Sequence, residues 1–142
     1  MILRWDSLGG VGRETPQAAL LVQASGDFSA RPRPGDTVRR TGRLAPAALQ
    51  ALLTEILDQH RFASISAAAI SARIQQISQR TGRMFKTLDG GETGIELDLP
   101  HLQHRVVFPA LQAAHGQFPE VEALRHLHAI QQRLLSLANE AR

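Results

Sequence analysis

The sequence predicts a single α+β domain with helices packed on one face of an antiparallel sheet of about five to six strands. Its 142 residues suit one domain, residues 1–142. Short segments with alternating polarity fall into two groups, and longer segments with helical periodicity follow each group. Strands and helices do not alternate one by one, which a doubly wound parallel sheet would require.

The first group of strands begins at the N-terminus. Apolar and charged residues alternate over residues 2–8, which predicts a half-buried strand. Residues 17–24 are rich in Leu and Val and predict a second strand. Gly26-Asp27 predicts a two-residue turn, so that the chain returns as a hairpin from Phe28. A further short strand is expected over residues 36–41.

Three helices are expected. Leucine and isoleucine spacings of three and four predict a first helix over about residues 46–60. Ser64 or Ser66 can cap a second helix that ends at Gly82. Pro119 is expected to open the last helix. One apolar stripe follows this helix for about five turns, at Val121, Leu124, Leu127, Ile130, Leu134 and Leu137.

The second group of strands lies between the second and third helices. Asp89-Gly90-Gly91 is a turn signal, and apolar residues then alternate with acids over residues 95–99. Residues 100–103 are expected to turn the chain, and residues 105–108 to return it. The two groups would then form one antiparallel sheet.

Composition excludes several classes of function. The chain has no cysteine, so disulfides, thiol catalysis and cysteine-ligated zinc are excluded. No apolar run reaches the roughly 20 residues of a membrane span, and charges interrupt the N-terminus too early for a signal peptide. As it stands the chain reads as a soluble cytoplasmic protein, although an upstream leader would leave the same sequence. We therefore assign no compartment.

Charge is distributed unevenly along the chain. The net charge is +3, but residues 28–86 hold ten cations against three acids. Such a segment is either a solvated face that attracts the acidic C-terminal part, or a basic face for an anionic partner.

Two copies of Arg-Thr-Gly-Arg lie at 40–43 and 80–83, each at a predicted junction. Arginines beside a glycine turn are suited to anion binding. The anion-binding candidates are Arg39, Arg40, Arg43, Arg80 and Arg83.

Histidines provide candidates for metal ligands. His101 and His104 are separated by two residues in a predicted hairpin, where a continuous strand would point them to opposite faces. A composite metal site would need Glu122 from the last helix as well. Pairing between Glu122 and His126, one helical turn apart, explains Glu122 without a metal. No metal or cofactor is therefore predicted.

Four carboxylates lie within ten residues, at Asp89, Glu92, Glu96 and Asp98. Glu96 and Asp98 share a strand face and could flank a substrate, as paired acids do in sugar hydrolysis. The alternative is the polar face of a half-solvated strand opposite Arg105. We favour this alternative, because no calcium-loop pattern or nucleophile motif accompanies the acids.

Three functional hypotheses follow. The first is a small non-catalytic domain that binds another protein or assembles with itself, because the polar residues that catalysis would need are scattered. The second is anion or nucleic-acid binding through the arginines, which is disfavoured for nucleic acid because the chain has no Tyr and one Trp for stacking. The third is a metal-assisted or acid/base enzyme, which requires His101, His104, Glu96 and Asp98 to converge in a pocket.

Overall fold

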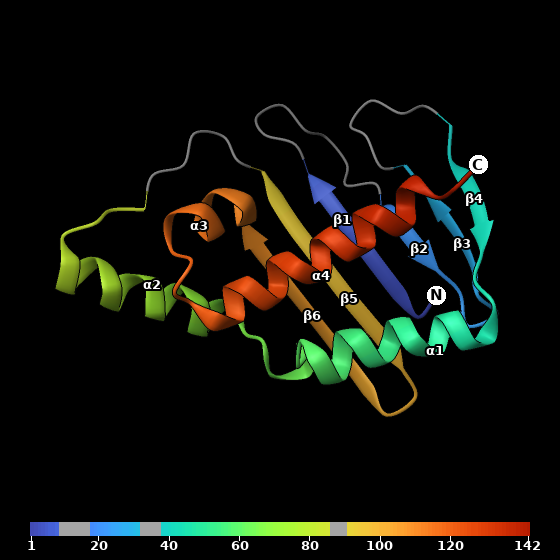
Figure 1. The fold of residues 1–142 in the computed structure, drawn as a ribbon, viewed down its shortest axis with the longest axis horizontal. Helices are drawn as coiled ribbons and strands as arrows, with labels where there is room; N and C mark the ends of the chain where they lie inside the picture. The colour runs from blue at the N-terminus through green and yellow to red at the C-terminus, as the bar shows by residue number, and fades with distance from the viewer. Residues whose placement is uncertain (9–17, 32–37, 86–90) are drawn as a thin grey trace.

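A six-stranded antiparallel sheet forms the centre of the structure, a computed structural model that describes residues 1–8, 18–31, 38–85 and 91–142 (Figure 1). The strand order across the sheet is β4-β3-β2-β1-β5-β6. The strands are β1 (Leu3–Leu8), β2 (Ala18–Val22), β3 (Asp27–Ala30), β4 (Arg40–Arg43), β5 (Glu92–Leu99) and β6 (Leu102–Pro109). The predicted fold class and strand number are confirmed.

The helices pack against one face of this sheet (Figure 1). Helix α1 (Pro46–Thr54) continues as a π-helical turn, η1 (Glu55–Gln59), and a 3₁₀ turn, η2 (Phe62–Ser64), precedes α2 (Ala67–Thr81). After β6 come α3 (Leu111–Gln117) and α4 (Glu122–Asn139). None of the described helices is both long and apolar enough to span a membrane.

Strand β1 joins the two groups of strands into one sheet. It pairs with β2 on one side and with β5 on the other, and its register places Trp5 between Leu20 and Ile95. These apolar side chains share the face that the helices cover, and each is at most 2% exposed. Helix α4 crosses that face diagonally (Figure 1). Each residue of its predicted apolar stripe is at most 4% exposed, so the stripe packs into the hydrophobic core.

The hairpin between β2 and β3 differs from the predicted two-residue turn at Gly26-Asp27. Its loop is Ala24-Ser25-Gly26, closed by a hydrogen bond from Gln23 N–H to the Asp27 carbonyl of 2.8 Å. Gly26 has a φ of +95° and occupies the last loop position, where three-residue hairpins place a left-handed residue. Asp27 already belongs to the return strand, so the predicted turn was one residue too short and ended one residue too late.

Helix boundaries follow local chemistry. Pro46 begins α1, and the helical run extends through η1 to residue 59, close to the predicted end at 60. The Ser66 hydroxyl accepts a hydrogen bond from Ala69 N–H at 3.3 Å, and Gly82 ends α2 with a φ of +76°, as predicted. The last helix begins at Glu122 rather than at Pro119, because residues 118–121 form a turn closed by Val121 N–H on the Phe118 carbonyl. Helix α3 was not predicted.

Candidate functional site: the open face of the sheet

The face of the sheet opposite the helices carries polar side chains. We call this surface the open face, because no described helix packs on it (Figure 1). Alternation along each strand decides which side chains it receives. Leu3, Trp5 and Leu97 point into the core, whereas Arg4 and Glu96, their chain neighbours, point to the open face. The predicted alternation of residues 2–8 is therefore confirmed for the residues whose burial is described.

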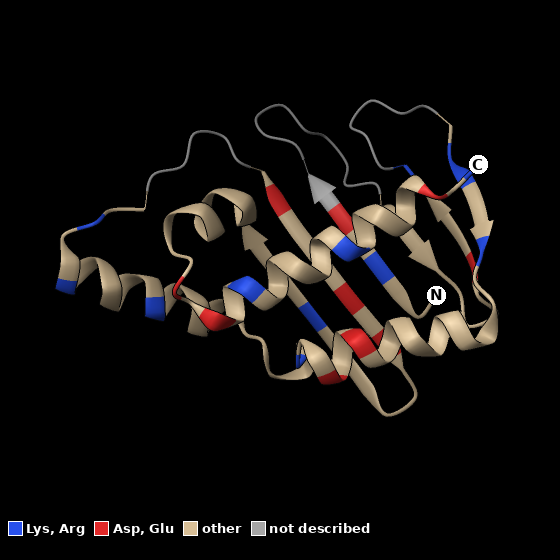
Figure 2. Ribbon diagram, in the orientation of Figure 1, with Lys and Arg blue, Asp and Glu red and all other residues tan. Residues whose placement is uncertain are grey.

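An ion-pair network occupies the centre of the open face. Arg4 Nε donates to both carboxylate oxygens of Asp6, at 2.9 and 3.1 Å, and Arg105 Nη2 lies 3.9 Å from Asp6 Oδ2. The Asp6 side chain is only 8% exposed, whereas that of Arg105 is 57% exposed. The register places Glu96 between Arg4 and Arg105. Figure 2 shows these opposite charges on neighbouring strands β1, β5 and β6.

The position of Glu96 beside Arg105 agrees with the expected polar strand face. Asp98, two residues further along β5, accepts a hydrogen bond of 3.1 Å from Gln103 Nε2. Asp98 is therefore bonded to β6, and Glu96 lies opposite a cation of that strand. Asp89, from the same predicted cluster, and Gly90 of the turn signal lie outside the described residues.

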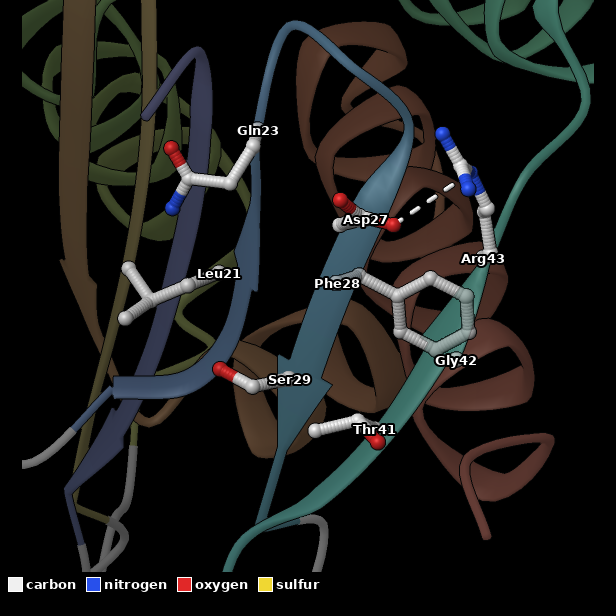
Figure 3. A pocket seen from close by; sticks show the side chains of 8 residues that line it. All are labelled: Leu21, Gln23, Asp27, Phe28, Ser29, Thr41, Gly42 and Arg43. Carbon is white, nitrogen blue, oxygen red and sulfur yellow. Dashed lines mark ion pairs between the residues drawn. The ribbon is translucent and has the colours of Figure 1, made fainter.

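A shallow hollow of about 600 Å³ lies over β2, β3 and β4 (Figure 3). The strand register aligns Leu21, Ser29 and Thr41 in a row across its floor. At one end Arg43 Nε lies 3.4 Å from Asp27 Oδ1, and both side chains are more than half exposed. The hollow thus offers apolar contact, hydroxyl groups and an ion pair that solvent reaches.

Arg39 lies beside this hollow and spans two strands. Its Nε donates to Ser29 Oγ at 3.1 Å, and its two terminal nitrogens donate to the Ala18 and Ser29 carbonyls, at 2.6 and 3.0 Å. Burial and the like charges of Arg31 and Arg4 lower the pKa of Arg39 below its ordinary value. The three cations therefore share one neighbourhood on the open face.

The two Arg-Thr-Gly-Arg segments lie at opposite ends of the molecule (Figures 1 and 2). The first is strand β4 itself, and the second forms the last turn and cap of α2. Arg83 donates to Glu120 at 2.5 Å and to the Gln117 carbonyl at 3.0 Å, and it lies over the Phe118 ring. The structure therefore brings Arg39, Arg40 and Arg43 near one edge of the sheet and separates them from Arg80 and Arg83.

The histidine and acid candidates are not brought together. His101 is exposed in the β5–β6 hairpin, whereas His104 lies on the helix face, with its Nε2 2.8 Å from the Ile65 carbonyl oxygen. Glu96 and Asp98 lie on the opposite face of the sheet, and Glu122 lies 3.6 Å from His126 on α4. Among the described residues, no three His, Cys, Asp or Glu side chains are grouped so that they could hold a metal ion.

Two histidine pairs flank α4, and sequence reasoning did not find them. His60 Nδ1 lies 3.0 Å from His126 Nδ1, and the rings of His115 and His128 stack with centroids 4.1 Å apart. Burial, followed by the neighbouring histidine, lowers the pKa of both His60 and His128. These contacts join α4 to the end of η1 and to α3, so they depend on tertiary packing that no local pattern encodes.

Comparisons with known proteins give no match: no family model, curated protein or solved structure shows significant similarity to this chain. The function of the protein must therefore be inferred from the geometry of the open face.

Proposed function

We propose that this protein is a protein-interaction module that docks its partner on the open face of the sheet. The observation that carries the proposal is the preorganised polar surface over six strands, which no described helix covers and which has a hollow at β2–β4. A surface whose polar groups are already held in place by its own ion pairs loses little side-chain freedom when a partner binds.

The charges of this face favour a protein over a nucleic acid. The described open face carries Arg4, Arg31, Arg39, Arg43 and Arg105 against Asp6, Asp27, Glu92, Glu96 and Asp98. Such near-balance does not attract a polyanion strongly, because nucleic-acid affinity depends on neutralising many phosphates.

The aromatic residues also favour a protein partner over a nucleic acid. Single-stranded nucleic acids are bound by exposed aromatic rings on which bases stack. Trp5 and four of the five phenylalanines are at most 5% exposed, and the fifth, Phe85, is partly buried beside Phe118. The described open face therefore has no stacking platform.

Self-association through α4 receives no support from the apolar stripe, because the stripe is buried in the core. The large apolar side chains that are exposed in the described part of the chain are Met1, Val38, Met84 and Val107. They come from four separate segments. A polar docking surface for a different protein therefore accounts for the molecule better than an apolar dimer contact.

Site-specific photo-crosslinking in cells tests the proposal. A photoreactive amino acid is placed at Thr41 or at Gln103 on the open face, and at Gln132 or Ser136 on the exposed side of α4 as matched controls. We expect defined higher-mass adducts from the open-face positions and none of those species from α4. All four positions are exposed, so circular dichroism should report unchanged folding.

Two outcomes would contradict the proposal. Adducts of equal yield from both faces would show that contact is not specific to the sheet, and the absence of adducts from both open-face positions would show that no partner docks there.

A further inference from the structure

Arg39 holds a positive charge that no described carboxylate neutralises. Its three hydrogen bonds all go to neutral oxygens, those of Ser29 Oγ and of the Ser29 and Ala18 carbonyls. No acidic side chain of the described residues lies within ion-pair distance of it. Arg4, by contrast, is paired with Asp6, and Arg43 with Asp27.

The position of the Arg39 side chain is fixed. Bonds to β2 and β3 hold the guanidinium against the sheet, and a guanidinium has more N–H donors than these three bonds use. Ser29 also lines the hollow, so the guanidinium that contacts it lies at the border of the hollow. An arginine held in this way can bind a planar anion with little further loss of side-chain freedom.

The neighbours of Arg39 add to its positive potential. Arg31 and Arg4 act on it as like charges. Arg31 follows Ala30, which faces the core, so alternation points Arg31 to the open face as well. Three arginines are therefore gathered on this side of the described open face, and one of them, Arg4, is paired with Asp6.

We propose that Arg39, with Arg31 and Arg4 beside it, is the subsite of the open face that receives a carboxylate from an acidic segment of the partner protein. This inference rests on the proposed function and specifies the chemistry of the partner. Charge complementarity favours an acidic segment, and the fork of an arginine matches the two oxygens of a carboxylate.

The same geometry explains why the adjoining hollow suits a peptide. The row formed by Leu21, Ser29 and Thr41 gives an extended chain both apolar contact and hydrogen-bonding groups next to the basic subsite. The partner segment would place an acidic residue at Arg39 and neighbouring residues over this row.

A double-mutant cycle tests the contact directly. The probe is a fluorescein-labelled peptide of repeating Glu-Gly, and its matched form has Gln in place of Glu. Binding to the full chain is followed by fluorescence anisotropy. We expect wild-type protein to bind the Glu peptide about tenfold more tightly than the Gln peptide, and Arg39→Gln to remove this difference.

Control variants separate charge from position. Arg125→Gln removes an equal charge from α4, where the guanidinium donates to the Pro119 carbonyl, and should leave the preference for Glu intact. Ser29→Ala keeps the charge of Arg39 but removes the Nε acceptor, and should reduce the preference without abolishing it. Circular dichroism of each variant verifies that the fold is retained.

Several results would overturn the subsite. These are equal affinity for the two peptides, no binding of the Glu peptide, or an undiminished preference in Arg39→Gln. Displacement of the peptide by inorganic phosphate at far lower concentration than by acetate would identify a free polyanion as the ligand instead of a protein carboxylate.

Failure of the subsite and failure of the proposed function can be distinguished. Crosslinking from Thr41 is repeated in an Arg39→Gln background. Undiminished adducts would refute the subsite while the open face remains a docking surface, whereas adducts missing from wild-type protein as well would refute both.

Discussion

Gly42 has no side chain at the point where the Phe28 ring lies across strand β4 (Figure 3). A Cβ at residue 42 would clash with three atoms of that ring. Because Phe28 is 5% exposed and packed in the core, the ring has little room to move. We expect Gly42→Ala to lower the free energy of unfolding by about 1–3 kcal/mol, as overpacking does, in urea denaturation followed by circular dichroism.

Gly116→Ala is the matched control for this substitution. Outside the chain neighbours and the backbone of its own helix, the added methyl group would have no described atom within 4 Å. Gly116 lies within helix α3, where alanine has the higher propensity. Stability should stay unchanged or rise by up to about 1 kcal/mol. If the two variants lost stability equally, the Phe28 contact would not be the cause.

Asp6 is the nearly buried centre of the ion-pair network. Replacing it with Asn removes the charge that Arg4 and Arg105 share. We expect Asp6→Asn to destabilise the fold by about 1–3 kcal/mol, since the charge-assisted hydrogen bonds from Arg4 to the Asp6 carboxylate are lost at a nearly buried position. Asp98→Asn, at an exposed position, should change stability by less than about 0.5 kcal/mol in the same thermal denaturation.

At the scale of single elements, α2 depends on the residue that precedes it. The Ser66 hydroxyl is the side-chain cap of this helix. Ser66→Ala should cost about 1 kcal/mol of unfolding free energy, because Ala69 N–H loses its acceptor. Ser71→Ala, at an exposed interior position of the same helix, should be neutral or slightly stabilising. A cap effect equal at both positions would contradict this assignment.

The histidine pairs make the packing of α4 sensitive to pH. The pKa values of His60 and His128 are lowered in the folded state, so the unfolded chain binds more protons as the pH falls below about 6.5. Their contribution to stability is present above the unfolded pKa and is lost as the pH falls through the folded pKa. Glu55 opposes the effect at His60, since it favours the charged ring.

We therefore expect the unfolding free energy to decrease between pH 7 and about pH 5, and to decrease less in the double variant His60→Gln, His128→Gln. Urea titrations at each pH measure this. His101→Gln, in the exposed hairpin, should retain the wild-type pH dependence. Stability that rises on acidification would show that the pairs are not held neutral.

Elements with strong local signals could be predicted from the sequence. The α4 stripe, the cap at Ser66 and the pairing of Glu96 with Arg105 follow from period, capping chemistry and alternation. Helix α3 could not, because it has one turn of apolar contact and no side-chain cap. The hydrogen bonds of Arg39 to β2 and β3 and the two histidine pairs could not be predicted either, since each joins segments that only the tertiary fold brings together.

At the scale of the whole molecule, the near-balance of charge on the open face should exclude polyanions. The variant Asp27→Asn, Glu96→Gln, Asp98→Asn removes three of its acids and keeps all five arginines. We expect this variant to be retained on heparin at low salt and released as salt rises, whereas wild-type protein passes through. Strong retention of wild-type protein would instead favour the anion-binding hypothesis.

Trp5 makes the protein its own optical reporter. It is the only tryptophan, the chain has no tyrosine, and the indole is 2% exposed with no hydrogen-bond partner for Nε1 among the described residues. Its emission should therefore lie at short wavelength and resist quenching by aqueous solutes. Arg4 and Asp6, on either side of it in β1, point to the other face of the sheet. A docked partner would leave the indole dry, so the same fluorescence signal distinguishes a bound molecule from an unfolding one.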